Sequence, residues 1–193
     1  MIDIINLPFV LEQNEHKLKG AKIYGKIVKT LTQYEVLDGK VTLLDSADCF
    51  AVIDCVCIDL CEHKEWLQEQ GVWNKTGFYF LNGEIGVYVG NANVSLGKFV
   101  SVKGTVRLKK FVNSEYPIVN MLNYAFMGDN LILHKAYLRE INFAELPKKT
   151  RFAEYLQKSI ENNTVILPEE ARELVQFWGY KPDILSERIL NFA

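Results

Sequence analysis

The chain has 193 residues, of which 49% are hydrophobic and 12% aromatic, which is enough for a folded core and excludes general disorder. Its 22 Lys and Arg against 24 Asp and Glu give a net charge of −2, so the chain is not basic throughout. No apolar run could span a membrane, and residues 1–11 lack the basic start of a signal peptide, so we expect reduced thiols inside a cell.

Residues 20–142 show the alternation and the turn residues of β-strands, whereas residues 148–193 show helical spacing. The sequence therefore predicts a strand-rich part followed by a helical part. In chain order, the predicted strands are 21–31, 41–45, 50–60, 77–80, 84–89, 98–111 and 116–127, and residues 131–141 form a last strand or a helix.

Turn residues set the connections between these strands. Asp38-Gly39 closes the loop 32–40 after the first strand. Residues 61–70 predict a short charged helix before a glycine, and Asn82-Gly83 predicts a hairpin between the two strands that flank it.

The strand at 98–111 has the clearest alternation in the sequence. One face carries Lys103, Arg107 and Lys109, which we call the basic ladder. The ladder should lie in water, because the opposite face is apolar and should be buried. The apolar residues are Val100, Val102, Val106 and Leu108.

Both faces of the strand at 50–60 are apolar, so both should be covered. The interior of a barrel covers one face, and a helix or another protein must cover the second. One face holds Phe50, Val52, Val56 and Ile58, and the other holds Ala51, Ile53, Cys55 and Cys57.

Five strands with this spacing, and a helix after the third, predict a small Greek-key barrel, the OB-fold. We therefore expect a mainly β protein: an OB-fold five-stranded Greek-key barrel with an inserted hairpin and C-terminal α-helices. The barrel domain should span residues 15–147, after an N-terminal arm at 1–14. Residues 148–193 should form a helical segment that packs on the barrel or on a partner.

Residues 43–57 read LLDSADCFAVIDCVC, an aspartate turn followed by Ile-x-Cys-x-Cys. Together with residues 99–107 (FVSVKGTVR) and 9–16 (FVLEQNEH), this stretch resembles the middle OB-fold subunit of the CST telomere complex. That family is related to the middle subunit of replication protein A. The turn lacks the Gly that is common in the family, and Ile58 stands where a Trp is usual, so a generic OB-fold protein is the alternative.

The resemblance implies a non-catalytic subunit that assembles with a small OB-fold subunit and a larger scaffolding subunit on single-stranded telomeric DNA. It also implies a nuclear location at chromosome ends and a bearing on telomerase; outside that family we expect a cytoplasmic location. The family's middle subunit carries C-terminal winged-helix domains, for which 193 residues leave no room. The chain would then be an N-terminal fragment or a reduced member.

The cysteines do not predict a metal site, although Cys49, Cys55, Cys57, Cys61 and His63 are close in sequence. Residues two apart on a strand are ~6.6 Å apart, whereas sulfurs bound to one Zn²⁺ lie ~3.8 Å apart. We expect buried, reduced cysteines and no metal or other cofactor. The sequence also lacks a nucleophile motif and a phosphate loop, so we expect no enzyme.

Positive charge is concentrated in residues 98–135, which hold six Lys and Arg against two acidic residues. Single-strand binding combines phosphate neutralisation with stacking of bases on aromatic side chains. In OB-folds two loops rim the ligand groove, here 32–40 and 112–115. We expect weak or partner-assisted binding, and a solvated strand face without a ligand is the alternative. The predicted nucleic-acid-binding residues are Tyr24, Lys26, Tyr34, Lys103, Arg107, Lys109, Phe111 and Tyr116.

Residues 148–193 hold more large apolar side chains than a segment of this length can bury by itself. We expect them to form part of a protein interface or to pack on the barrel. The predicted interface residues are Phe152, Tyr155, Leu156, Ile160, Leu174, Phe177 and Trp178. A pure protein–protein interaction scaffold without nucleic-acid contact is therefore the alternative function.

Overall fold

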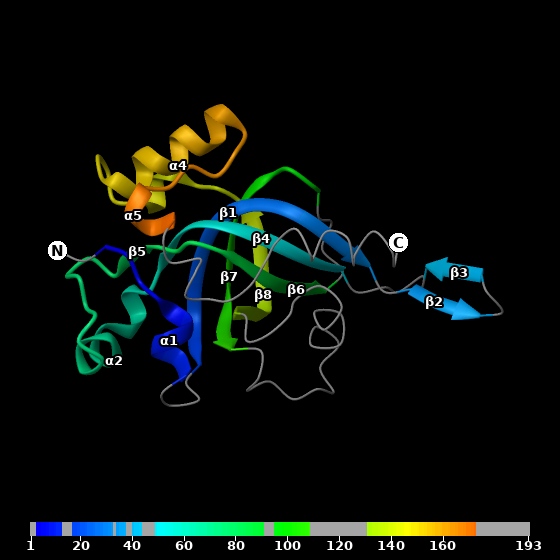
Figure 1. Ribbon diagram of the computed structural model, residues 1–193, viewed down its shortest axis with the longest axis horizontal. Coiled ribbons are helices and arrows are strands. Elements are labelled where there is room, and N and C mark those ends of the chain that lie inside the picture. The colour runs from blue at the N-terminus through cyan, green and yellow to red at the C-terminus, as the bar shows by residue number, and fades with distance from the viewer. Residues whose placement is uncertain are drawn as a thin grey trace.

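Five strands of the computed structural model close into a barrel (Figure 1). They are β1 (Leu18–Thr32), β4 (Cys49–Asp59), β6 (Glu84–Gly90), β7 (Phe99–Leu108) and β8 (Leu131–Glu140). Their order is β1-β7-β8-β6-β4, and β4 pairs back with β1. All neighbours are antiparallel except β6 and β8. This is the strand order of the OB-fold, so the predicted fold class is confirmed.

Shorter elements surround the barrel. They are α1 (Leu7–Glu12), β2 (Tyr34–Leu37), β3 (Lys40–Leu43), η1 (Cys61–His63), α2 (Lys64–Glu69), β5 (Phe78–Phe80), η3 (Phe143–Glu145), α4 (Arg151–Asn162) and α5 (Glu169–Arg172). The hairpin of β2 and β3 projects from the barrel in Figure 1. The structure describes residues 3–12, 17–32, 34–37, 40–43, 49–90, 95–108 and 131–172.

The second strand of the barrel differs from the prediction. The sequence predicts it at 41–45, but β3 pairs with β2 in a separate two-stranded sheet. The second barrel strand is β4, so η1 and α2 follow the second barrel strand rather than the third. Strand propensity does not identify a strand's partner, and an inserted hairpin therefore has the same signature as a barrel strand.

Asn82-Gly83 does not form the predicted hairpin, because β5 and β6 pair one after the other with β4 instead of with each other. Between them, the Leu81 amide donates to the Val56 carbonyl at 3.2 Å, and the Cys55 amide donates to the Gly83 carbonyl at 3.0 Å. Gly83 has a φ of 125°, which suits glycine. β5 and β6 therefore run along the same edge of β4 one after the other, and the dipeptide forms the kink between them.

Both faces of β4 are buried, as predicted, but a β-bulge changes which residues share a face. Tyr24 on β1 lies opposite Cys57, and Gly25 lies opposite Cys55, so Val56 is an extra residue. Cys55 belongs to the barrel core, whereas Val56 and Cys57 belong to a second cluster outside the barrel. The two cysteines therefore lie on opposite faces of the sheet.

The barrel core includes the apolar face of β7, as predicted, and part of the N-terminal arm. Leu7, Val10 and Leu11 of α1 are buried in the same cluster. Before α1, the chain extends the sheet, since the Phe80 amide donates to the Asp3 carbonyl at 2.6 Å. The arm is thus part of the folded domain.

A helix covers the outer face of β4, as Figure 1 shows for α4. The ring of Phe80 on β5 lies 4.7 Å from that of Phe152, centroid to centroid, and 5.3 Å from that of Tyr155. Leu156 is fully buried in the same cluster. Of the two predicted covers, a helix or another protein, the structure has the helix.

Candidate nucleic-acid interface

Two predicted interface residues, Phe152 and Leu156, are buried within the chain, which is the packing on the barrel that the sequence allowed as the alternative to a partner contact. Tyr155 and Ile160 are partly buried against the same cluster. Helical spacing shows that a helix has an apolar stripe, but it does not show whether the stripe packs on its own domain or on a partner. The remaining predicted interface residues lie outside the described residues: Leu174, Phe177 and Trp178.

Tyr24 is fully buried, contrary to the prediction that it stacks on a base. It packs with Cys57 and Leu146 in the cluster beneath α4. Lys26, on the same face of β1, donates from Nζ to the Asn163 carbonyl at 2.7 Å. Asn163 is the C-cap of α4, where a cation complements the helix dipole. Both β1 residues therefore hold α4 in place.

A group of side chains crosses β1, β7 and β8 on the outer surface of the barrel; three are exposed, and the fourth, Lys22, is half-buried. Lys103 on β7 lies between Lys22 on β1 and Tyr137 on β8 in the strand pairing. The Lys103 side chain is 53% exposed, and Tyr137 is 73% exposed. Arg139 lies two residues beyond Tyr137, on the same face of β8. We call Lys22, Lys103, Tyr137 and Arg139 the outer patch.

Arg107, a member of the basic ladder, is half-buried and lies opposite Ile132 on the same face of β7 as Lys103. The prediction omitted Tyr137 because residues 131–141 fitted either a strand or a helix, and only a strand places Tyr137 beside Lys103. The other predicted binding residues lie outside the described part of the structure: the side chain of Tyr34 and all of Lys109, Phe111 and Tyr116.

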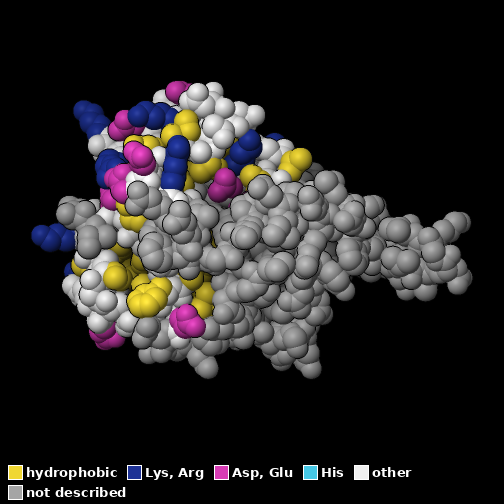
Figure 2. Space-filling model, in the orientation of Figure 1, with side chains coloured by type: hydrophobic (Ala, Val, Ile, Leu, Met, Phe, Trp, Pro, Cys, Tyr) yellow, Lys and Arg dark blue, Asp and Glu magenta, His cyan; other side chains and the backbone are white. Residues whose placement is uncertain are grey.

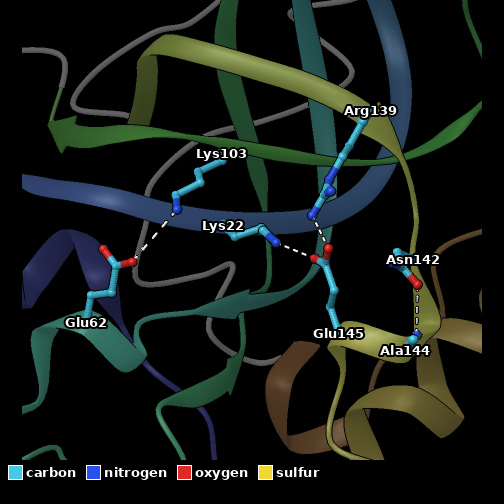
Figure 3. A network of polar contacts seen from close by, with 7 residues as sticks. All are labelled: Lys22, Glu62, Lys103, Arg139, Asn142, Ala144 and Glu145. Atoms are coloured by element: carbon cyan, nitrogen blue, oxygen red, sulfur yellow. Dashed lines mark hydrogen bonds and ion pairs between the residues drawn. The ribbon is translucent and has the colours of Figure 1, made fainter.

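A carboxylate lies between two cations of the outer patch (Figure 3). Glu145, the last residue of η3, accepts hydrogen bonds from Lys22 Nζ and from the Arg139 guanidinium. Asn142 Oδ1 accepts from the Ala144 amide at 3.0 Å and so caps the turn that presents Glu145. The hydrogen bond from Lys22, and then that from Arg139, lowers the pKa of Glu145. Glu145 therefore stays ionised at neutral pH.

The Lys103 ammonium has a looser acidic neighbour. Its Nζ lies 3.8 Å from a carboxylate oxygen of Glu62, and both side chains are exposed. Figure 3 shows Lys103 directed toward Glu62, on the other side of Lys22 from Glu145. Exposed ion pairs contribute only ~0–1 kcal/mol. Lys103 can therefore exchange Glu62 for a phosphate at little cost.

Two carboxyls lie opposite each other on the surface that OB-folds commonly use for ligands. That surface, the outer face of the second and third barrel strands, is formed by β4 and β6. Asp54 lies directly opposite Glu84 there. Burial, and then the charge of Glu84, raises the pKa of Asp54 to about 7, whereas Lys26 lowers it. Burial also raises the pKa of Glu84, against the effect of Lys29. Phosphates would be repelled here as these carboxyls ionise.

The cysteines are placed apart. Cys55 and Cys57 are buried on opposite faces of β4, and Cys61 is exposed. Within the described ranges, no group of three or more His, Cys, Asp and Glu side chains is arranged to hold a metal ion. None of the helices in that part of the chain is long and apolar enough to cross a membrane.

The outer patch and its carboxylates come from β1, η1, β7, β8 and η3, which the closed barrel brings together. Sequence proximity alone would not have grouped them. Neither the protein-family models nor the curated proteins compared with the chain give a match, so the assignment of this interface depends on its geometry.

Proposed function

We propose that the chain is a non-catalytic OB-fold subunit that supports single-stranded DNA binding. The observation that carries this proposal is the exposed Lys103 ammonium beside the exposed Tyr137 ring on the outer surface of the barrel. Phosphate neutralisation and base stacking are the two interactions by which proteins hold single strands without reading their sequence. Adjacent strands of one sheet supply both.

The assembly that we propose is telomere-associated and replication-protein-A-like, with a small OB-fold subunit and a larger scaffolding subunit as partners. The resemblance of residues 43–57, 99–107 and 9–16 to the middle subunit of the CST telomere complex supports it, and so does the OB-fold. A nuclear location at chromosome ends belongs to the same proposal.

DNA binding by the isolated chain should be weak, because its cations already have acidic neighbours. Glu145 lies between Lys22 and Arg139, and Glu62 lies near Lys103. On the face in Figure 2, basic and acidic side chains are likewise intermixed near α4. A partner subunit that binds a neighbouring part of the same DNA strand would raise the affinity, because two linked sites then hold one DNA molecule.

A salt titration tests the proposal. Fluorescence anisotropy would follow the binding of a labelled oligothymidylate of about 16 nucleotides, the upper site size of one OB-fold. Each phosphate that is neutralised contributes a slope of about −0.7 to log K against log salt for a single strand. We expect weak binding with a slope between about −1 and −3. No binding at low salt, by the chain alone or with its co-purified partners, would contradict DNA binding.

A second function, an interaction scaffold without DNA contact, is favoured by the opposed Asp54 and Glu84 on the usual ligand face. Under that function, the chain would capture a partner subunit, and the complex would not bind the oligothymidylate at any salt concentration. The same titration therefore separates the two candidates.

A further inference from the structure

We propose that a single strand of DNA crosses the outer patch, with a base on Tyr137, and that Glu145 competes with its phosphates for Lys22 and Arg139. This inference rests on the proposed function, because it assumes that the chain binds DNA. It adds where the strand lies and which residue of the chain limits its affinity.

Tyr137 is suited to stacking by its exposure and its neighbours. It is the most exposed aromatic residue among the described residues, at 73%. Its strand neighbour across the sheet is Lys103, and Arg139 shares its face of β8. Because the ring lies in water and not in the core, the fold does not depend on it. A base on this ring would bring its phosphates within reach of the two cations.

Glu145 occupies the place that a phosphate would take. Its carboxylate accepts from an ammonium and a guanidinium, which are also the preferred donors to phosphate oxygens. The turn that carries it is fixed by the Asn142 cap and by the buried Leu146. The carboxylate is therefore held over the two cations, and a phosphate must displace it or bind beside it.

If Glu145 competes with phosphates, removing its charge should raise the affinity for DNA. If Glu145 only stabilised the fold through its ion pairs, removing its charge would not raise that affinity. Glu145→Gln keeps the size of the side chain but removes its charge, so Lys22 and Arg139 become free to bind phosphate. We expect the affinity for oligothymidylate to rise several-fold. The slope of log K against log salt should also steepen by up to ~1.4, because two more cations take part.

A matched control separates local competition from net charge. Glu154→Gln on α4 removes the same charge from an exposed carboxylate that pairs with Lys158 at 2.9 Å. Glu154 pairs with no cation of the outer patch, so the affinity and the salt slope of this variant should stay near those of the unchanged chain. Equal gains in both variants would overturn the competition.

Substitutions of Tyr137 test where the DNA strand lies on the protein. Tyr137→Ala should weaken binding about fivefold or more, because a stacked base is lost, whereas Tyr137→Phe keeps the ring and should keep the affinity. Phe9→Ala removes another exposed aromatic, on α1, and should leave binding unchanged. Thermal unfolding of each variant should stay near that of the unchanged chain, because both side chains are exposed.

The outcomes distinguish this inference from the proposed function. If the chain binds DNA but Tyr137→Ala has no effect, the strand lies elsewhere, and the inference fails while DNA binding stands. If Tyr137→Ala weakens binding but Glu145→Gln does not strengthen it, the competition fails. If neither the unchanged chain nor Glu145→Gln binds at low salt, alone or with its co-purified partners, the proposed function fails and the inference with it.

Discussion

Asp54 on β4 and Glu84 on β6 lie directly opposite each other on the face where OB-folds commonly hold their ligands. Both carboxyls are half-buried, and burial raises the pKa of each. Two adjacent carboxyls of this kind do not favour a polyanion. This arrangement is the reason to look for the DNA on β1, β7 and β8.

The Asp54 carboxyl should make stability depend on pH. Its pKa rises on folding from 3.8 to about 7, so folding takes up a proton between these values. The stabilisation that the protonated Asp54 carboxyl gives to the folded state is fully present below its unfolded pKa of 3.8. It is lost as the pH rises through its folded pKa of about 7. Asp54→Asn should therefore be more stable than the unchanged chain at pH 8, by about 2–4 kcal/mol.

Urea unfolding at pH 5.5 and pH 8 measures this effect. The difference between Asp54→Asn and the unchanged chain should shrink at the lower pH. Glu161→Gln, which changes an exposed carboxylate on α4, serves as the control and should show no such trend. An Asp54→Asn variant that is less stable than the unchanged chain at pH 8 would show that the buried carboxylate is stabilised.

The docking of α4 should contribute strongly to stability. Phe152 is buried against Phe78 and Phe80, with ring centroids 5.9 Å and 4.7 Å away. Phe152→Ala should lower the free energy of unfolding by about 3–5 kcal/mol. Gln157→Ala, on the exposed side of the same helix, should have little effect in the same urea titration. Equal stability of both variants would mean that α4 is not part of the core.

Lys26 should matter for α4 and not for DNA. Lys26→Met keeps most of the side-chain stem but removes the ammonium that bonds to the Asn163 carbonyl at 2.7 Å. We expect a loss of about 0.5–2 kcal/mol and faster hydrogen exchange at the C-terminal turn of α4. DNA affinity should stay unchanged. If Lys26→Met loses DNA affinity while hydrogen exchange in α4 is unchanged, Lys26 contacts DNA and does not hold the helix.

The basic ladder should set the salt dependence of DNA binding. Replacing Lys103, Arg107 and Lys109 with Ala removes three cations and should flatten the slope of log K against log salt by up to ~2. The fold should persist, because the apolar residues by which β7 contributes to the barrel core lie on its other face: Val100, Val102, Val106 and Leu108. Unchanged affinity and slope in this variant would place the phosphates on another surface.

The sequence predicted the barrel and the two faces of β7 because those depend on local alternation. Val102 and Lys103 point to opposite sides of any sheet that contains this strand. The prediction for residues 41–45 was wrong because the choice of partner strand depends on contacts far along the chain. The hairpin predicted at Asn82-Gly83 is also absent, because turn residues allow a kink of the chain as well as a reversal.

The candidate site was only partly predictable. The sequence placed Tyr24 and Lys26 on the outer face of the first strand, but not the helix that covers them. Lys103 was predicted as a surface cation and is one. Its neighbour Tyr137 comes from a segment more than 30 residues away, and only the closed barrel sets it beside Lys103. Glu145 likewise meets Lys22 from a distant segment of the chain. Tertiary contacts of this range leave no local signal.

Photo-cross-linking to an oligothymidylate that carries 5-iodouracil reports where the DNA lies on the protein. Peptide mapping should then locate the cross-links on the protein. We expect the cross-links to concentrate at Tyr137 on β8, to increase in Glu145→Gln, and to be lost at high salt. Cross-links confined to the outer face of β4 and β6, beside Asp54 and Glu84, would contradict it.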